Sequence, residues 1–172
     1  MATAGHLPSR VHDTVSRKIR TVICLTVAVG VGALVIVAVS SGSALFGSVA
    51  VFAICGLLAY GINWLVYIPS NIAKTEHYFD LTGSITYVTV IVVALLLSDD
   101  LDTRAMIVGA MVIVWALRLG SFLFRRVRRD GRDGRFDEIK VDPLRFFMTW
   151  TLQGLWVLLT LAAALAIITA VE

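Results

Sequence analysis

The stretch WALRLGSFLFRRVRRDGRDGRFDEIKVDPLRFF, residues 115–147, contains the features that decide the fold. It begins in one apolar run and ends in another, and residues 125–145 between them carry eight Lys or Arg and five Asp or Glu side chains. A change from hydrocarbon to dense charge is typical of a loop between two membrane-spanning helices. Gly131 and Gly134 allow sharp turns in this loop. Asp142 followed by Pro143 predicts the next helix, with Asp142 as its N-cap.

The composition of the whole chain supports a membrane protein. Of its 172 residues, 58% are hydrophobic, against about 45–50% in an average soluble domain. With about 20 residues for each crossing, the length predicts an all-α fold: an integral membrane helical bundle with about five transmembrane helices. We expect a polar tail over residues 1–20 and a single transmembrane domain over 21–172, with loops near 69–83 and 125–142.

The apolar runs give the expected spans, and capping residues give their ends. The spans cover about residues 21–40, 45–68, 84–97, 104–124 and 143–171. The first exceeds the 7–15 apolar residues of a signal peptide, which favours an uncleaved span. Pro69 predicts the end of the second helix. Asp80 is a candidate N-cap for the third, and Asp102 or Thr103 for the fourth.

The charges predict how the bundle is oriented. The tail and residues 125–145 are basic, the turn at 41–44 is neutral, and the turn at 99–102 carries three acids. The positive-inside rule then places the N-terminus and the loops at 69–83 and 125–142 in the cytoplasm. The net charge of +3 lies at the ends of spans, so it reports topology and predicts no nucleic-acid partner.

Motifs for metal, phosphate and nucleophilic chemistry are missing from the sequence. Cys24 and Cys55 lie within apolar runs, where free thiols pack as small hydrophobic groups. No Walker loop, nucleophile elbow or metal-ligand cluster occurs, so we expect no metal site.

One face of the fourth helix carries cations. Trp115, Arg118, Phe122 and Arg125 follow one another by three or four positions and therefore line one side. Arg118 either extends its side chain to the interface or faces a polar cavity or an anionic partner. The arginines beyond it serve either topology alone or the binding of phosphate or lipid headgroups.

Two further helices place amides in the membrane. Asn63 shares a face with Tyr60, Trp64 and Tyr67, which indicates either an aromatic belt at the interface or the wall of a pocket. Gln153, near Trp150 on the fifth helix, either bonds a neighbouring helix or binds a ligand.

Three stretches in this order resemble a known family. HYFDLTGSITY at 77–87, WALRLGSFLFRRVRRDGRDGRFDEI at 115–139 and LRFFMTWTLQGLWV at 144–157 are similar to the bacterial steroid 5-alpha-reductase-like membrane proteins. The resemblance covers about residues 63–157. It implies a bundle in the bacterial inner membrane whose cytoplasmic side takes NADPH, and relatives of the family reduce carbon–carbon double bonds in sterols and steroids.

The resemblance also implies roles for individual residues. The implied cofactor-binding residues are Arg118, Arg125, Arg135 and Phe136, the last two ordering the loop over the cavity. The implied substrate-binding residues are Asn63, Trp150 and Gln153. A phenol or carboxyl group can polarise the substrate during reduction, and Tyr78 and Asp80, in the first matching stretch, are the candidate catalytic residues.

The sequence departs from the family pattern after the third stretch. The family has further spans with a Ser-Arg-His-Pro-Asn-Tyr type segment and much of the cofactor site, and this chain ends at Glu172 without them. We therefore expect the N-terminal part of such a reductase, or a shortened relative, that is incomplete as a catalyst. The alternatives are a non-catalytic subunit that packs against a partner or a second copy, and a membrane protein that binds anionic lipids through the 125–145 arginines.

Overall fold

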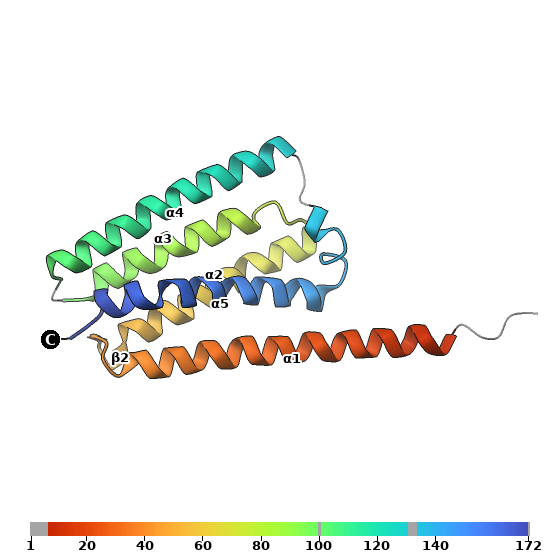
Figure 1. Ribbon diagram of the computed structural model, residues 1–172, viewed down its shortest axis with the longest axis horizontal. Coiled ribbons are helices and arrows are strands. Elements are labelled where there is room, and N and C mark those ends of the chain that lie inside the picture. Colours follow the sequence, from red (N-terminus) through yellow and green to blue (C-terminus); the bar gives the residue numbers. More distant parts are fainter. Residues whose placement is uncertain (1–6, 100, 131–133, 172) are drawn as a thin grey trace, which may run out of the picture.

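The computed structural model describes residues 7–99, 101–130 and 134–171, apart from the side chains of residues 7–13, Asp130 and Arg135. Five helices make up nearly all of the described chain (Figure 1). They are α1 (Leu7–Ser40), α2 (Val51–Ala73), α3 (Phe79–Leu97), α4 (Thr103–Asp130) and α5 (Pro143–Ile168). Each is long and apolar enough to cross a membrane. The predicted all-α bundle of five spans is confirmed.

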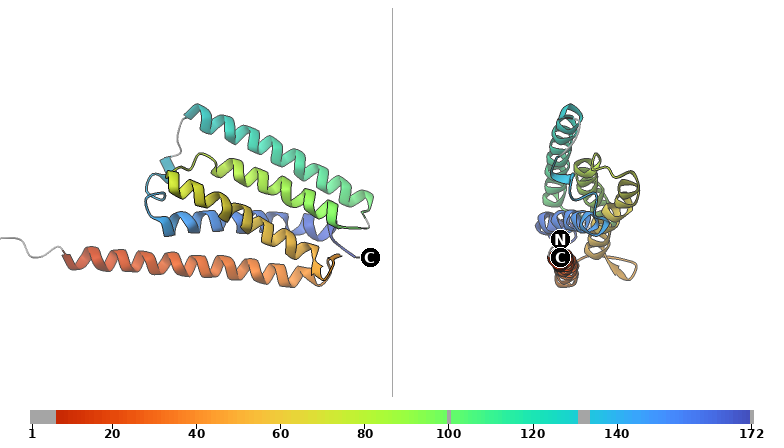
Figure 2. Two further views of the ribbon diagram at one scale, coloured as in Figure 1. Left: turned by 180° about the vertical axis from the view of Figure 1, so that it is seen from behind. Right: turned by 90° about the vertical axis from the view of Figure 1, so that its right-hand side faces the viewer.

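The helices lie side by side, with α1 and α4 on opposite sides of α2, α3 and α5 (Figures 1 and 2). The N-terminal part of α1 extends beyond the other helices (Figure 1). At one end of the bundle α2 turns into α3, and α4 turns into α5 through the short helix η1 (Gly134–Phe136). We call this the basic end, because the arginines that close α4 lie there.

The opposite end is closed by a small hairpin. Strands β1 (Leu45–Phe46) and β2 (Val49–Ala50) pair antiparallel, and Gly47 between them has a φ of 64°, which favours glycine. The amide of Ala44 donates to the carbonyl of Thr169 at 2.6 Å. This bond ties the turn between α1 and α2 to the C-terminal end of α5.

Several helix ends differ from the predicted spans. α1 begins at Leu7, so residues 7–20 of the expected tail are helical. α2 starts after the hairpin and continues through Pro69 to Ala73, because a membrane helix can re-satisfy the backbone groups that a proline frees. It ends where Lys74 adopts a left-handed conformation and its amide donates to the carbonyl of Ser70.

The capping predictions have different outcomes. Asp142 accepts hydrogen bonds from the amides of Leu144 and Arg145, so it caps α5 as predicted. Asp102 accepts from the amide of Ala105 at 2.6 Å. The prediction for Asp80 was wrong: Tyr78 occupies the N-cap position of α3, without a side-chain cap, and the carboxylate of Asp80 contacts α4 instead.

The core lies where α2, α3 and α5 meet. Its largest fully buried side chains include Phe52, Ile91, Leu158 and Leu161. At Gly154 of α5, an added Cβ would lie 3.0 Å from the carbonyl oxygen of Ala59. Small residues at such a crossing let two membrane helices approach closely. The close contact between α2 and α5 therefore depends on this glycine.

Gly154→Ala should lower the stability of the protein in detergent by about 1–3 kcal/mol, because the added methyl group meets backbone atoms of α2. Gly61→Ala is the matched control, since nothing lies within 4 Å of its added Cβ. It should leave the melting temperature unchanged or raise it, because alanine favours a helix. Equal melting temperatures for the two variants would contradict the close α2–α5 contact.

Candidate functional site

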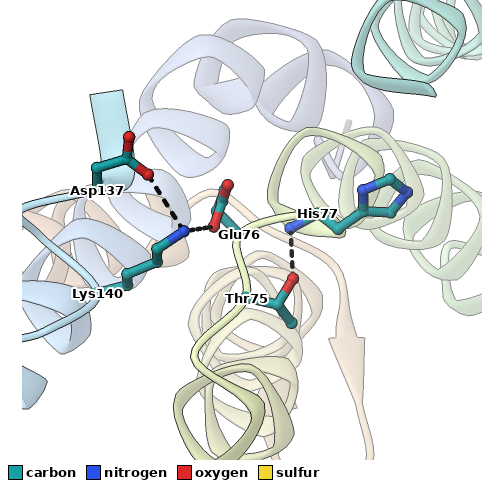
Figure 3. Close-up of polar contacts among 5 residues, drawn as sticks. All are labelled: Thr75, Glu76, His77, Asp137 and Lys140. Carbon is teal, nitrogen blue, oxygen red and sulfur yellow. Dashed lines mark hydrogen bonds and ion pairs between the residues drawn. The ribbon is translucent and has the colours of Figure 1, made fainter. Parts of the chain in front are cut away.

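Two polar contacts connect the segments of the basic end. The Lys140 ammonium donates to the Glu76 carboxylate at 2.9 Å, and it lies 3.3 Å from a carboxylate oxygen of Asp137 (Figure 3). Glu76 belongs to the turn between α2 and α3, and its side chain is only 7% exposed. The contact therefore holds the segment after η1 against the neighbouring turn.

Ion pairing also affects the titration of Lys140. Its hydrogen bond to Glu76 is the largest of the effects that raise the pKa of Lys140 above the ordinary value of 10.5. Because the folded pKa is raised, the pair stabilises the folded state at neutral pH. That contribution is lost as pH rises through the raised pKa.

A second ion pair joins α3 to α4. An Arg126 guanidinium nitrogen lies 3.2 Å from a carboxylate oxygen of Asp80. Asp80 lies in the first turn of α3, where a negative charge also interacts favourably with the helix dipole. The two side chains are 37% and 17% exposed, respectively, so the pair is partly shielded from solvent.

Aromatic rings pack beneath the η1 segment. Phe136 is 5% exposed, and its ring centroid lies 5.0 Å from that of Phe79 and 6.4 Å from that of Phe146. Trp150 packs edge-on against Phe79 at 5.0 Å. Burial of Phe136 fastens the chain between α4 and α5 to the first turn of α3. The side chain of Arg135, the neighbouring predicted cofactor residue, lies outside the described residues.

Three side chains that contact α3 each have a buried polar atom without a hydrogen-bond partner. They are Asn63 Oδ1, Trp150 Nε1 and Gln153 Oε1. The Nδ2 group of Asn63 donates to the Ala59 carbonyl at 2.8 Å and to Thr86 Oγ1 at 3.4 Å. Gln153 Nε2 donates to the Phe79 carbonyl at 2.9 Å.

These hydrogen bonds account for the nitrogen atom of each amide but not for its oxygen atom. The Asn63 and Gln153 amides connect α2 and α5 to α3, as interhelical hydrogen bonds would. The opposite atom of each amide, and the indole N–H of Trp150, still lack a partner. A buried polar atom without a partner is uncommon and costly. These three atoms can therefore accept from, or donate to, a bound polar group or water.

The cationic face of α4 points outward. Arg118 and Arg125 are exposed, and Trp115, on the same face, packs edge-on against Tyr87 at 5.0 Å. The helix has 28 residues and is therefore about 42 Å long, against a hydrocarbon core of about 30 Å. A hydrocarbon layer that began at Thr103 would end near residue 123, which would place Arg125 outside it and Arg118 somewhat more than one turn inside.

The predicted site residues therefore fall into two groups. Phe136, Trp150 and Gln153 meet around Phe79, and Asn63 contacts α3 through Thr86, about two helical turns further along. The structure does not bring Tyr78, Arg118 and Arg125 into this group. Tyr78 is 52% exposed, and its ring packs against His77. Asp80 belongs to the first turn of α3 and pairs with Arg126 of α4. It therefore connects α3 to the helix that carries Arg118 and Arg125.

Sequence reasoning missed Arg126 and the Glu76–Lys140 pair. Eight cations lie within residues 125–145, and helical periodicity alone does not choose among them. One usable signal was Val127, an apolar residue within RRVRR that is buried and marks the inward side of the end of α4. Its neighbour Arg126 is half-buried.

Comparison with known proteins shows the family to which the chain belongs. A model of a protein family of unknown function, DUF1295, matches residues 66–172, which is more than half of the chain. The chain belongs to the DUF1295 family. This is a steroid 5-alpha-reductase-like family, so the resemblance inferred from the three stretches is confirmed at the level of the family. No curated protein and no solved structure matches the chain.

The matched region of this DUF1295 chain contains most of the residues described above. It includes the Asp80–Arg126 pair, the Glu76–Lys140 pair and the aromatic rings around Phe136. Asn63 lies before it. The basic end is thus built mainly from the part of the chain that is characteristic of the family.

Lys140→Met should lower the free energy of unfolding by about 1.5–3 kcal/mol, because Glu76 loses a charged hydrogen-bond donor. Lys74→Met is the control, since Lys74 is exposed and bonds Asn71 within its own helix end. The difference in melting temperature between wild type and Lys140→Met should shrink as pH rises above the ordinary lysine value of 10.5. A difference that stays constant with pH would indicate lost packing rather than lost charge.

Proposed function

We propose that this chain is a reductase-type membrane protein that binds NADPH at the basic end and acts on a carbon–carbon double bond of a hydrophobic substrate. One observation carries the proposal. Asn63, Trp150 and Gln153 leave three buried polar atoms without partners, and the last two side chains contact Phe79, against which Phe136 packs. Membership of a steroid 5-alpha-reductase-like family supports the same reading.

The proposal orients the protein with the basic end in the cytoplasm of a bacterium, where NADPH is available. Arg17, Lys18 and Arg20 of α1 and the arginines that close α4 lie toward the same end of the bundle (Figure 1). Asp99 and Asp102 lie toward the other end. This distribution agrees with the positive-inside rule.

In this proposal the exposed guanidinium groups of α4 bind the phosphates of the dinucleotide. Arg118 and Arg125 are separated by about 10 Å along one helix face, and NADPH carries phosphate at two separate places. Arginine binds phosphate oxygens through a planar pair of donors. Both side chains are exposed, and neither forms an ion pair or hydrogen bond within the described part of the chain.

The residues of this chain would orient the substrate and supply a proton. Bound NADPH supplies a hydride to one carbon of the double bond. The indole N–H of Trp150 can donate to a polar oxygen of the substrate, and the amide oxygens of Asn63 and Gln153 can accept from a hydroxyl group. Tyr78 is the candidate proton donor to the second carbon. Asp80, held by Arg126 at 3.2 Å, is the candidate for positioning the first turn of α3.

Purified protein should bind NADPH in equilibrium dialysis, and Arg118→Gln with Arg125→Gln should weaken binding. Each charged contact to phosphate contributes about 1.5–3 kcal/mol, so the double variant should lose at least about a hundredfold in affinity. Arg104→Gln is the control, because Arg104 is exposed at the opposite end of α4. Wild-type protein without measurable binding, or equal binding by all three proteins, would contradict the cofactor proposal.

A further inference from the structure

An apolar groove lies between α3 and α4, and none of the residues that line it belongs to the proposed cofactor or substrate site. Its volume is about 310 Å³, which is near the lower end of the range for small-molecule sites. The lining residues of α3 lie between Leu81 and Thr89, and those of α4 lie between Ala116 and Phe124. The groove thus follows the two helices for about 12 Å.

The floor of the groove is formed by a close contact of the helices. A Cβ added at Gly120 would lie 2.6 Å from the side chain of Ser84, so α3 and α4 approach closely here. Ser121, on the wall, donates its hydroxyl hydrogen to the Leu117 carbonyl at 2.6 Å. This internal bond occupies its donor. Ser84 and Thr89 add two further hydroxyl groups to the lining, and the other lining residues are apolar.

The charge beyond the groove indicates what would occupy it. Arg125 and Arg128 follow the wall residues Ser121 and Phe124 by four positions, so they continue the same side of α4 toward the basic end. Both are exposed. Neither makes a hydrogen bond or ion pair among the residues that the structure describes. Two cations therefore follow this apolar groove along α4, toward the basic end.

We propose that this groove holds one acyl chain of an anionic bilayer phospholipid, with its phosphate bound by Arg125 and Arg128. A hydrocarbon chain matches the lining, and a negative headgroup complements the two cations. The volume and the apolar walls exclude a dinucleotide from the groove itself. The lipid site shares Arg125 with the proposed cofactor site. It is tested without NADPH, so that either proposal can fail while the other stands.

Photo-crosslinking in vesicles tests the proposal. Protein is reconstituted in phosphatidylcholine vesicles that contain either phosphatidylglycerol or phosphatidylcholine with a diazirine in one acyl chain, and the labelled peptides are identified by mass spectrometry. The phosphatidylglycerol probe should label residues 81–89 and 116–124 more strongly than the phosphatidylcholine probe does. Equal labelling by both probes would overturn the role of the two arginines.

Two sets of variants test the apolar groove and the two cations separately. Ser121→Trp should fill the groove and abolish labelling there, whereas Val114→Trp, an exposed residue of the same helix outside the groove, should not. Arg125→Gln and Arg128→Gln should each reduce the preference for phosphatidylglycerol roughly fivefold, and Arg104→Gln should not. Labelling that survives Ser121→Trp, or protein–protein crosslinks through the α4 face in place of lipid adducts, would overturn the site.

Discussion

The need to satisfy polar groups without water governs this bundle. Inside a membrane, an amide or hydroxyl that finds no protein partner is expensive to bury. Most buried polar side chains among the described residues have a hydrogen-bond partner. Tyr60 donates to the Ala28 carbonyl at 2.9 Å, and the hydroxyl groups of Tyr87 and Thr160 are hydrogen-bonded at 2.6 Å. The exceptions among the described residues are the hydroxyl groups of Ser40 and Ser98, at helix ends, and the atoms of Asn63, Trp150 and Gln153, beside α3, where a ligand or water can bind.

The basic end shows how a charged connection is held on an apolar bundle. Burial of Phe136 among Phe79, Phe146 and Trp150 supplies the hydrophobic contact, and Lys140 bonded to Glu76 sets the position of the segment after η1. Arg126 bonded to Asp80 then ties α4 to α3. The residues that hold this connection therefore surround the first turn of α3, which Trp150 and Gln153 also contact.

The sequence predicted the bundle and two of its caps, Asp102 and Asp142, because apolar runs of about 20 residues and an Asp before a helix are local signals. It predicted helix ends less well. Pro69 does not end α2, since the helix is re-formed beyond it to Ala73, and no local signal distinguishes a proline that interrupts a membrane helix from one that is tolerated. The start of α1 at Leu7 was not predicted, because the polar residues that precede the first apolar run are typical of a tail.

The sequence could not predict which side chains pair across helices, because those pairs depend on how the helices pack. From its place near the start of α3, Asp80 can either cap the helix or form an ion pair. The outcome depends on where α4 places Arg126. Gln153 and Asn63 were open between interhelical bonding and ligand binding, and each has one atom bonded between helices and one without a partner. The family was recognisable from three stretches because their order and spacing are specific together.

Hydrogen–deuterium exchange of the purified protein, with and without NADPH, tests most directly whether the basic end is a cofactor site. Bound NADPH should slow exchange in residues 134–142 and in the first turns of α3, and leave the turn at 97–103 unchanged. Exchange that is unaltered at the basic end, or altered equally at both ends of the bundle, would contradict this account.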